Sequence, residues 1–363
     1  MNSLPSLNAS QVDKEHQWKT WVAREIQQRA LLAHYTLDGL IAQMSGETTS
    51  VRHAANKLGL PSSETVFEAS TANEWLIHMR SQKADCSSFR SIFRSLFPPV
   101  SASQLLDQDL SAFSLRIILE GLQSIIADCD EGDIAAVGVP SKSEVRRALA
   151  QVHEIITRNG HLSTADRLET LLRWHAICLD AAANSSLLCR YVCSRYDIVQ
   201  HVLGGGKGIK PDLDLIRWAS TEDARTALLH AVAIQDIVEQ LPRGRAHVIH
   251  MPNSLFAAAT VYSIFSLAGP TAVSLPRTVD WKDVLAPELE PRMAFEGLGA
   301  SIDSDTRRYV RGESASGAGY PGATRNLLYE LNSMQKLFRC LSSQWGVAHD
   351  MESVVSQWIT LCH

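Results

Sequence analysis

The chain reads LLRWHAICLDAAANSSLLCR at residues 171–190, TEDARTALLHAVAIQDIVEQ at residues 221–240 and SLFAAATVYSIFSLA at residues 254–268. In the first two runs, apolar residues recur three or four positions apart, which is the spacing of one face of an α-helix. The third run is apolar on nearly every side, which is typical of a helix buried inside a protein, and it is too short to span a bilayer. These runs predict an all-α protein.

The same periodicity extends outward in both directions. An apolar stripe begins at Trp18 and continues to Ile41, and further helices are expected at 51–57, 64–79, 103–109, 111–128, 187–203, 326–343 and 347–361. Three serines, Ser141, Ser163 and Ser220, each stand three residues before an acidic residue, as in a helix capping box. Alternating strand patterns are nearly absent.

We therefore expect a multi-helix bundle with one continuous core over residues 15–363. Residues 1–14 are expected to be disordered. The segment GESASGAGYPGAT at residues 312–324 has the composition of a flexible loop.

Composition excludes some classes of function. The chain has 363 residues, of which 45% are hydrophobic and 20% charged, and its net charge is −5. This balance argues against direct contact with nucleic acid, whose phosphates require a basic surface. The chain has neither a signal peptide pattern nor an apolar run that could span a membrane. Seven cysteines, an odd number, favour reduced thiols in an intracellular protein.

Four residues are candidates for a binding pocket: Trp174, His175, Trp218 and His230. Tryptophan is heavily buried on average, so core packing is the first interpretation, but the same side chains could line a cavity for an apolar ligand. His230 is expected to face the core with one ring nitrogen satisfied. No catalytic residue is identified, and an enzyme is not favoured.

Three other patterns have both a functional and a structural explanation. Glycines 204–206 and 208 around Lys207 suggest a phosphate loop, but the preceding segment is helical and no Ser or Thr follows the lysine. Cys189 and Cys193, with Cys178, His175 and His201 nearby, suggest a metal site, yet buried core thiols explain the same spacing. His247 and His250, near His230, suggest a catalytic or metal site, but a loop-anchoring role is commoner. We expect neither a metal nor a cofactor.

Several blocks of the chain, in order, resemble the regulatory ("fungal-specific transcription factor") domain that follows the zinc finger in many fungal gene regulators. The matching residues are Trp18, Trp21, Glu25, Arg29, Leu37-Asp38, Leu60-Pro61, Phe67-Glu68-Ala69, Trp75, Arg173-Trp174-His175, Leu179-Asp180, Cys193–Tyr196, Leu203–Lys207, Asp223–Arg225 and Leu228–His230. Phe67 stands where the family has tryptophan. No zinc-finger motif is present in the chain.

This resemblance implies an all-helical domain that regulates transcription in the nucleus through a small-molecule effector or protein partners, a homodimer included. The family's DNA-contacting residues cannot be carried over, because their motif is absent. An alternative is a finger-less member recruited as an enzyme or ligand-binding protein of a secondary-metabolite pathway, which would place the chain in the cytoplasm. Met1, just before the Trp18 helix, favours this alternative. A third hypothesis is a dimerisation scaffold that pairs through residues 255–268 or the terminal helices.

Overall fold

A computed structural model describes residues 10–45, 49–50, 58–81, 89–97, 110–130, 140–204, 213–242, 248–285, 304–313 and 323–363. The helices are α1 (Gln11–Ser45), α2 (Glu64–Phe67), α3 (Ala72–Ser81), α4 (Phe89–Ser95), α6 (Ala112–Asp130), α7 (Lys142–Arg158), α8 (Thr164–Ala182), α9 (Ser185–Arg195), α10 (Leu215–Ala219), α11 (Glu222–Gln240), α12 (Met251–Leu267), α13 (Trp281–Leu285), α14 (Asp305–Arg311), α15 (Leu327–Leu341) and α16 (Val347–Cys362). The two strands are β1 (Ala272–Leu275) and β2 (Ala323–Asn326). The all-α prediction is confirmed.

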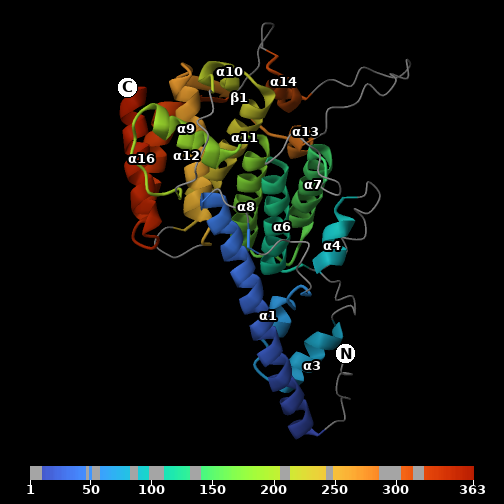
Figure 1. The fold of residues 1–363 in the computed structure, drawn as a ribbon. Coiled ribbons are helices and arrows are strands. Elements are labelled where there is room, and N and C mark those ends of the chain that lie inside the picture. The colour runs from blue at the N-terminus through green and yellow to red at the C-terminus, as the bar shows by residue number, and fades with distance from the viewer. Residues whose placement is uncertain are drawn as a thin grey trace, which may run out of the picture.

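Helix α1 projects from the body of the molecule (Figure 1). Its C-terminal half packs on α6, and its N-terminal half packs on α3. The predicted long helix at 18–41 is therefore present, and it begins earlier, at Gln11. Residues 11–14 were expected to be disordered, and that expectation is wrong. The hydroxyl of Ser10 accepts a hydrogen bond from the Asp13 amide at 3.2 Å, which caps the helix start.

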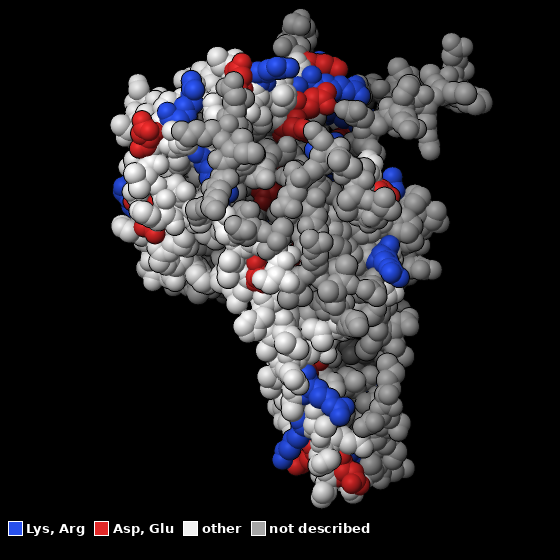
Figure 2. Space-filling view, in the orientation of Figure 1, with Lys and Arg blue, Asp and Glu red and all other residues white. Residues whose placement is uncertain are grey.

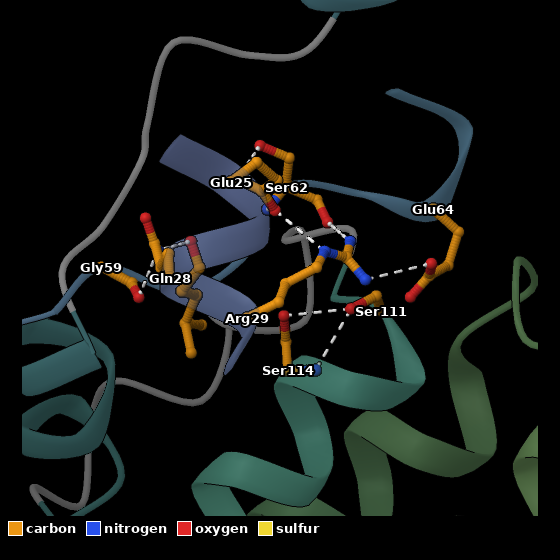
Figure 3. A network of polar contacts seen from close by, with 9 residues as sticks. Glu25, Gln28, Arg29, Gly59, Ser62, Glu64, Ser111 and Ser114 are labelled. Atoms are coloured by element: carbon orange, nitrogen blue, oxygen red, sulfur yellow. Dashed lines mark hydrogen bonds and ion pairs between the residues drawn. The ribbon is translucent and has the colours of Figure 1, made fainter. Parts of the chain in front are cut away.

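A polar network fixes α1 to the segment before α2 (Figure 3). The Arg29 guanidinium donates to the Glu25 carboxylate at 3.0 Å and to the Ser62 carbonyl at 2.8 Å. Glu25 in turn accepts the Ser62 amide at 2.9 Å. The guanidinium also lies 3.9 Å from the ring centroid of Phe67. Glu25, Arg29 and Phe67 lie in the blocks that resemble the regulatory-domain family. In the structure they connect α1 to residues 62–67.

The body is a succession of packed helices. α6 packs on α7 and α8, α8 packs on α11, and α11 packs on α12. α12 then contacts α15 and α16, and α16 lies along one side of the body (Figure 1). α8 and α11 therefore lie at the centre.

Buried hydrophobic residues gather into two large clusters and a small one. The largest lies among α8, α9, α11, α12, α15 and α16, and the second lies among α1, α4, α6, α7 and the other face of α8. Leu171 and Trp281 pack against both, so the two clusters adjoin. The third consists of Val66, Ala69, Trp75 and Leu76, with Trp18 and Trp21 packed against it.

Helix α12 is buried from Met251 to Phe265, as its apolar sequence predicts. Three of its hydroxyls are satisfied within the helix. Ser254, Thr260 and Ser263 each donate to the carbonyl four residues earlier, at 2.8 to 2.9 Å. This back-bonding lets polar residues sit in a helix that touches little water.

Two predicted helices end differently in the structure. The helix expected over 64–79 is split, because the Thr71 hydroxyl accepts the Glu74 amide at 3.2 Å and starts a new helix. The helix expected over 187–203 ends at Arg195 rather than at the glycine run. There Asp197 adopts a left-handed φ of 53°, and the Ile198 amide bonds back to the Cys193 carbonyl at 2.8 Å.

The predicted caps are confirmed at two serines and corrected at the third. Ser141 forms the full capping box with Glu144, and Ser163 accepts the Asp166 amide. Ser220 instead follows the last residue of α10, and Thr221 caps α11. Threonine at this position bonds an N3 amide as serine would, so the predicted signal is shifted by one residue.

The strand pair was not predicted. β1 pairs antiparallel with β2, with Ala272 opposite Asn326 and Leu275 opposite Ala323. Ala323 and Thr324 therefore lie in a strand, not in the expected loop, and Gly312 ends α14 with a left-handed φ of 73°. Four-residue strands are too short to show the alternation that identifies a strand in sequence. Residues 314–322 of that loop and the helices expected at 51–57 and 103–109 lie outside the described residues.

Charged side chains of both signs intermingle at the end of the molecule that carries α10 and α14 (Figure 2). Arg307 pairs with Asp283 at 2.8 Å, and Arg308 lies 3.8 Å from Glu313. Among the described helices, none has the length and hydropathy that crossing a membrane requires.

Candidate functional site

Three consecutive residues of α8 contact three different helices. Arg173 donates to Glu120 on α6, and Trp174 donates from Nε1 to the Leu149 carbonyl on α7 at 2.8 Å. The His175 ring meets His230 on α11. Because successive helical residues point about 100° apart, one turn of a central helix can connect several neighbours. The candidate site lies on the Trp174 and His175 side of this turn.

Trp174 is fully buried, and its ring is surrounded by aromatic rings. The centroid of its ring lies 4.5 Å from that of His153 and 4.7 Å from that of His175. The His230 ring centroid lies 5.5 Å away, in an edge-on arrangement. These separations are those of favourable aromatic pairs. Three of the four predicted pocket residues therefore do lie together, with His153 added.

His175 and His230 face each other through Nδ1, at 2.9 Å. A hydrogen bond between two Nδ1 atoms requires one ring to donate and the other to accept, so the two neutral rings hold opposite tautomers. Burial lowers the pKa of both, that of His230 to about 3, and repulsion from His153, whenever that ring is protonated, lowers both further. The Nε2 atom of His230 is buried without a hydrogen-bond partner among the described residues. The prediction of a core-facing His230 with one satisfied nitrogen is confirmed.

Trp281 completes the cluster and is not among the residues that the sequence predicts for the site. Its ring stacks on His230, with the centroids 4.7 Å apart and the planes at 22°, and lies 4.5 Å from the His175 ring. It is the first residue of the five-residue helix α13, where no periodic apolar run marks it as a core residue. The Asp280 carboxylate accepts the Lys282 amide at 2.9 Å, an aspartate signal for a helix start.

A pocket of about 550 Å³ opens beside this cluster. Small-molecule sites usually have volumes of roughly 300–1,000 Å³. His153 and Trp281, both partly exposed, connect the pocket to the buried rings. The described lining comes from α7, the start of α13 and the start of α14: His153, Glu154, Thr157, Arg158, Thr278, Val279, Asp280, Trp281, Lys282, Ser304, Asp305 and Thr306.

Two contacts fix the far wall of the pocket. The Asp280 amide donates to the Thr306 hydroxyl at 3.1 Å, and Asp283 pairs with Arg307 at 2.8 Å. The start of α14 is therefore tied to α13, which packs in turn on α7. Because these contacts hold both walls, the pocket is largely formed before a ligand arrives.

Trp218, the fourth predicted pocket residue, lies elsewhere. Its ring packs edge-on against Phe265 of α12 at 5.8 Å, and it adjoins the largest core cluster. It lies on the five-residue helix α10, which packs on α11 and α12. Trp218 is therefore a packing residue here.

The glycine, cysteine and loop-histidine patterns of the sequence give no site among the described residues. The sulfur atoms of Cys189 and Cys193 are 4.0 Å apart and buried. No group of three or more His, Cys, Asp or Glu side chains in the described part of the chain could hold a metal ion. His250 is buried at the start of α12, whereas His247 and residues 205–208 lie outside the described residues.

His153 is the one histidine of the described lining. Burial lowers the pKa of His153, and the charge of Lys282 adds to this, so the one described histidine of the lining is neutral near pH 7. The lining offers aromatic surface, hydroxyls and carboxylates on fixed walls. No protein-family model, no curated protein and no solved structure matches the chain.

Proposed function

We propose that this chain is the regulatory domain of a fungal transcription regulator, which acts in the nucleus and responds to a small molecule held in the α7–α13–α14 pocket. The observation that carries the proposal is the pocket itself, because it adjoins the central helix of the fold through His153 and Trp281. The all-helical architecture and the ordered family-like blocks support the transcriptional part.

The position of α8 supports a regulatory role. Trp174 and His175 contact the rings at the pocket, while the adjacent Arg173 is bound to Glu120 and Gln43. Gln43 lies in the last turn of α1. A ligand that shifts the rings would therefore act on a turn that also holds the projecting helix. Coupling of this kind needs such a physical connection between two sites.

The experiment fuses the chain to an unrelated DNA-binding domain and measures a reporter gene in a fungal host. We expect the fusion to change reporter output relative to the DNA-binding domain alone. Thr157→Trp, which places an indole in the pocket, should alter that output. Thr157 is an exposed helical threonine whose hydroxyl bonds the carbonyl four residues back, so the substitution should not unfold the protein.

Thr360→Trp is the matched control, because Thr360 is also exposed and makes the same type of bond within α16. A fusion that leaves the reporter at its baseline, with folded protein present, would contradict the transcriptional role. The alternative of a recruited enzyme or ligand-binding protein predicts that outcome, since it uses the same pocket without any effect on transcription.

A further inference from the structure

We infer that the pocket takes an uncharged, planar aromatic molecule that carries hydroxyl groups, which stacks on Trp281 and donates hydrogen bonds to carboxylates of the lining. This inference rests on the proposed effector pocket and names the chemical class that it binds.

The aromatic part of the inference follows from a group of packed rings that ends at the pocket. Trp174, His175 and His230 have their rings packed against one another, and Trp281 lies parallel to His230 at 4.7 Å. The first three are buried, whereas Trp281 is partly exposed and lines the pocket. The stack therefore ends at the pocket with indole surface that another ring could cover. Offset stacking of aromatic rings is favourable beyond the burial of area alone.

The lack of charge follows from the neighbours of the ring surface. The lining carries three carboxylates, those of Glu154, Asp280 and Asp305, so an anion would meet repulsion. A cation would meet Arg158 and Lys282, and the Lys282 charge already helps to lower the pKa of the adjacent His153. A neutral molecule avoids both costs.

The hydroxyl groups follow from the carboxylates that remain for a ligand. Glu154 is already paired with Arg158 at 2.7 Å, so these are Asp280 and Asp305. Ionised carboxylates only accept hydrogen bonds. The hydroxyl of Thr157 already donates to the carbonyls of His153 and Glu154, at 2.9 and 3.1 Å. A bound molecule must therefore bring donors of its own if the carboxylates are to stay satisfied once water leaves, since an unmet acceptor is costly. Phenolic hydroxyls provide such donors on a flat, neutral ring.

Isothermal titration calorimetry on the full chain tests the class with three probes of one shape. 2,7-Dihydroxynaphthalene is expected to bind. 2,7-Dimethoxynaphthalene, which has no donors, and naphthalene-2-sulfonate, which is anionic, should each bind at least about tenfold more weakly, a difference of about 1.4 kcal/mol. Trp281→Ala should weaken the dihydroxy probe by a similar factor.

Because Trp281→Ala removes packing, Thr157→Trp supplies a second test that fills the pocket from an exposed position, and Thr360→Trp is its control. The inference is overturned if the sulfonate or the dimethoxy probe binds as tightly as the dihydroxy probe. It is equally overturned if none of the three binds up to millimolar concentration, or if Thr157→Trp leaves binding unchanged.

These outcomes are separable from the failure of the proposed function. If the reporter fusion responds to Thr157→Trp but no naphthalene binds, the regulatory pocket stands and the inferred class falls. If 2,7-dihydroxynaphthalene binds in the pocket but the fusion never changes the reporter, the class stands and the transcriptional role falls.

Discussion

The Nδ1 atoms of His175 on α8 and His230 on α11 lie 2.9 Å apart, and both side chains are buried. The pair is held neutral by burial, which lowers the pKa of both rings. The two rings lie between the central helices α8 and α11, so protonation of either ring bears on the stability of the whole body.

The first prediction concerns acid stability. In the unfolded chain a histidine titrates near pH 6.5, whereas the folded pKa of His230 is about 3. Between these values the unfolded state binds more protons, so the free energy of unfolding falls as the pH falls, by up to about 1.4 kcal/mol per pH unit for each such histidine. The contribution that the buried, neutral histidines make to the free energy of unfolding is complete above pH 6.5 and is lost as the pH falls. Urea unfolding from pH 7.5 to 4.5 measures the slope.

His230→Leu should lower the slope by an amount that corresponds to the uptake of up to one proton on unfolding. The stability of this variant at pH 7 also drops, because His175 loses its partner. His16→Gln is the control, since His16 is exposed on α1. A slope in His230→Leu equal to that of the original protein would show that the buried ring does not titrate as proposed.

The second prediction concerns the ion pair between Arg173 and Glu120. Two N–O distances of 2.7 Å make it bidentate, and both side chains are almost completely inaccessible to water. Glu120→Ala leaves the guanidinium buried without its counter-charge, which should cost about 3–5 kcal/mol. Chemical denaturation measures the loss.

Arg339→Ala is the matched control, because the Arg339 side chain is 63% exposed and its pair with Glu352 is only partly buried. Exposed pairs contribute about 0–1 kcal/mol, so this variant should be nearly neutral. Equal losses in the two variants would mean that burial does not set the strength of the Arg173 pair.

Local pattern predicted most of the helices, and the reasons are visible in particular elements. α7, α8 and α11 carry apolar residues at helical spacing and start at capping residues, and both signals are local. The largely apolar run of α12 likewise predicted a buried helix. The short elements α10, α13 and α14 were missed because five to seven residues give too few turns to show a period.

The candidate site was only half predictable. Trp174, His175 and His230 lie on helices whose buried faces follow from the sequence, so their grouping was a reasonable expectation. Trp281 joins them from a position more than 50 residues beyond His230, and no local signal links the two. Trp218 was grouped with them by residue type alone, and its short helix instead places it against Phe265. Long-range contacts of this kind are set by tertiary packing.

The third prediction concerns Gly121 on α6. A Cβ at this position would lie 2.8 Å from the Phe93 ring and 3.1 Å from the Phe89 ring. These rings stack with centroids 5.6 Å apart, so neither can move freely. Overpacking should cost Gly121→Ala about 1–3 kcal/mol, partly offset by the better helix propensity of alanine. Thermal unfolding monitored by circular dichroism measures the balance.

Gly346→Ala is the control, because no atom lies within 4 Å of its added Cβ and Gly346 has an α-helical conformation at the start of α16. It should leave the midpoint unchanged or raise it slightly. A Gly121→Ala protein as stable as Gly346→Ala would mean that the two phenylalanines can repack.

The fourth prediction concerns Gln43, which fixes the last turn of α1 to the body. Its side-chain oxygen accepts from Arg173 at 3.1 Å, and its amide nitrogen donates to the buried carboxylate of Asp180. Burial raises the pKa of Asp180, while its hydrogen bonds from Ser185 and Gln43 oppose that rise. Gln43→Ala removes a partner from two buried charged groups and should cost about 1–3 kcal/mol.

Because the lost contacts lie at one end of α1, the effect should be local as well as global. In Gln43→Ala, hydrogen exchange followed by mass spectrometry should be accelerated, relative to the original protein, more in the C-terminal turns of α1 than in α12. The described hydrogen bonds of the Gln43 side chain go to α8. Gln27→Ala is the control, since Gln27 is exposed on the same helix. Uniform acceleration in both helices would show that Gln43 supports the fold as a whole and does not specifically hold α1. If the C-terminal turns of α1 were as protected in Gln43→Ala as in Gln27→Ala, Gln43 would not hold α1 to the body. A ligand near Trp174 could then not act on α1 through Gln43.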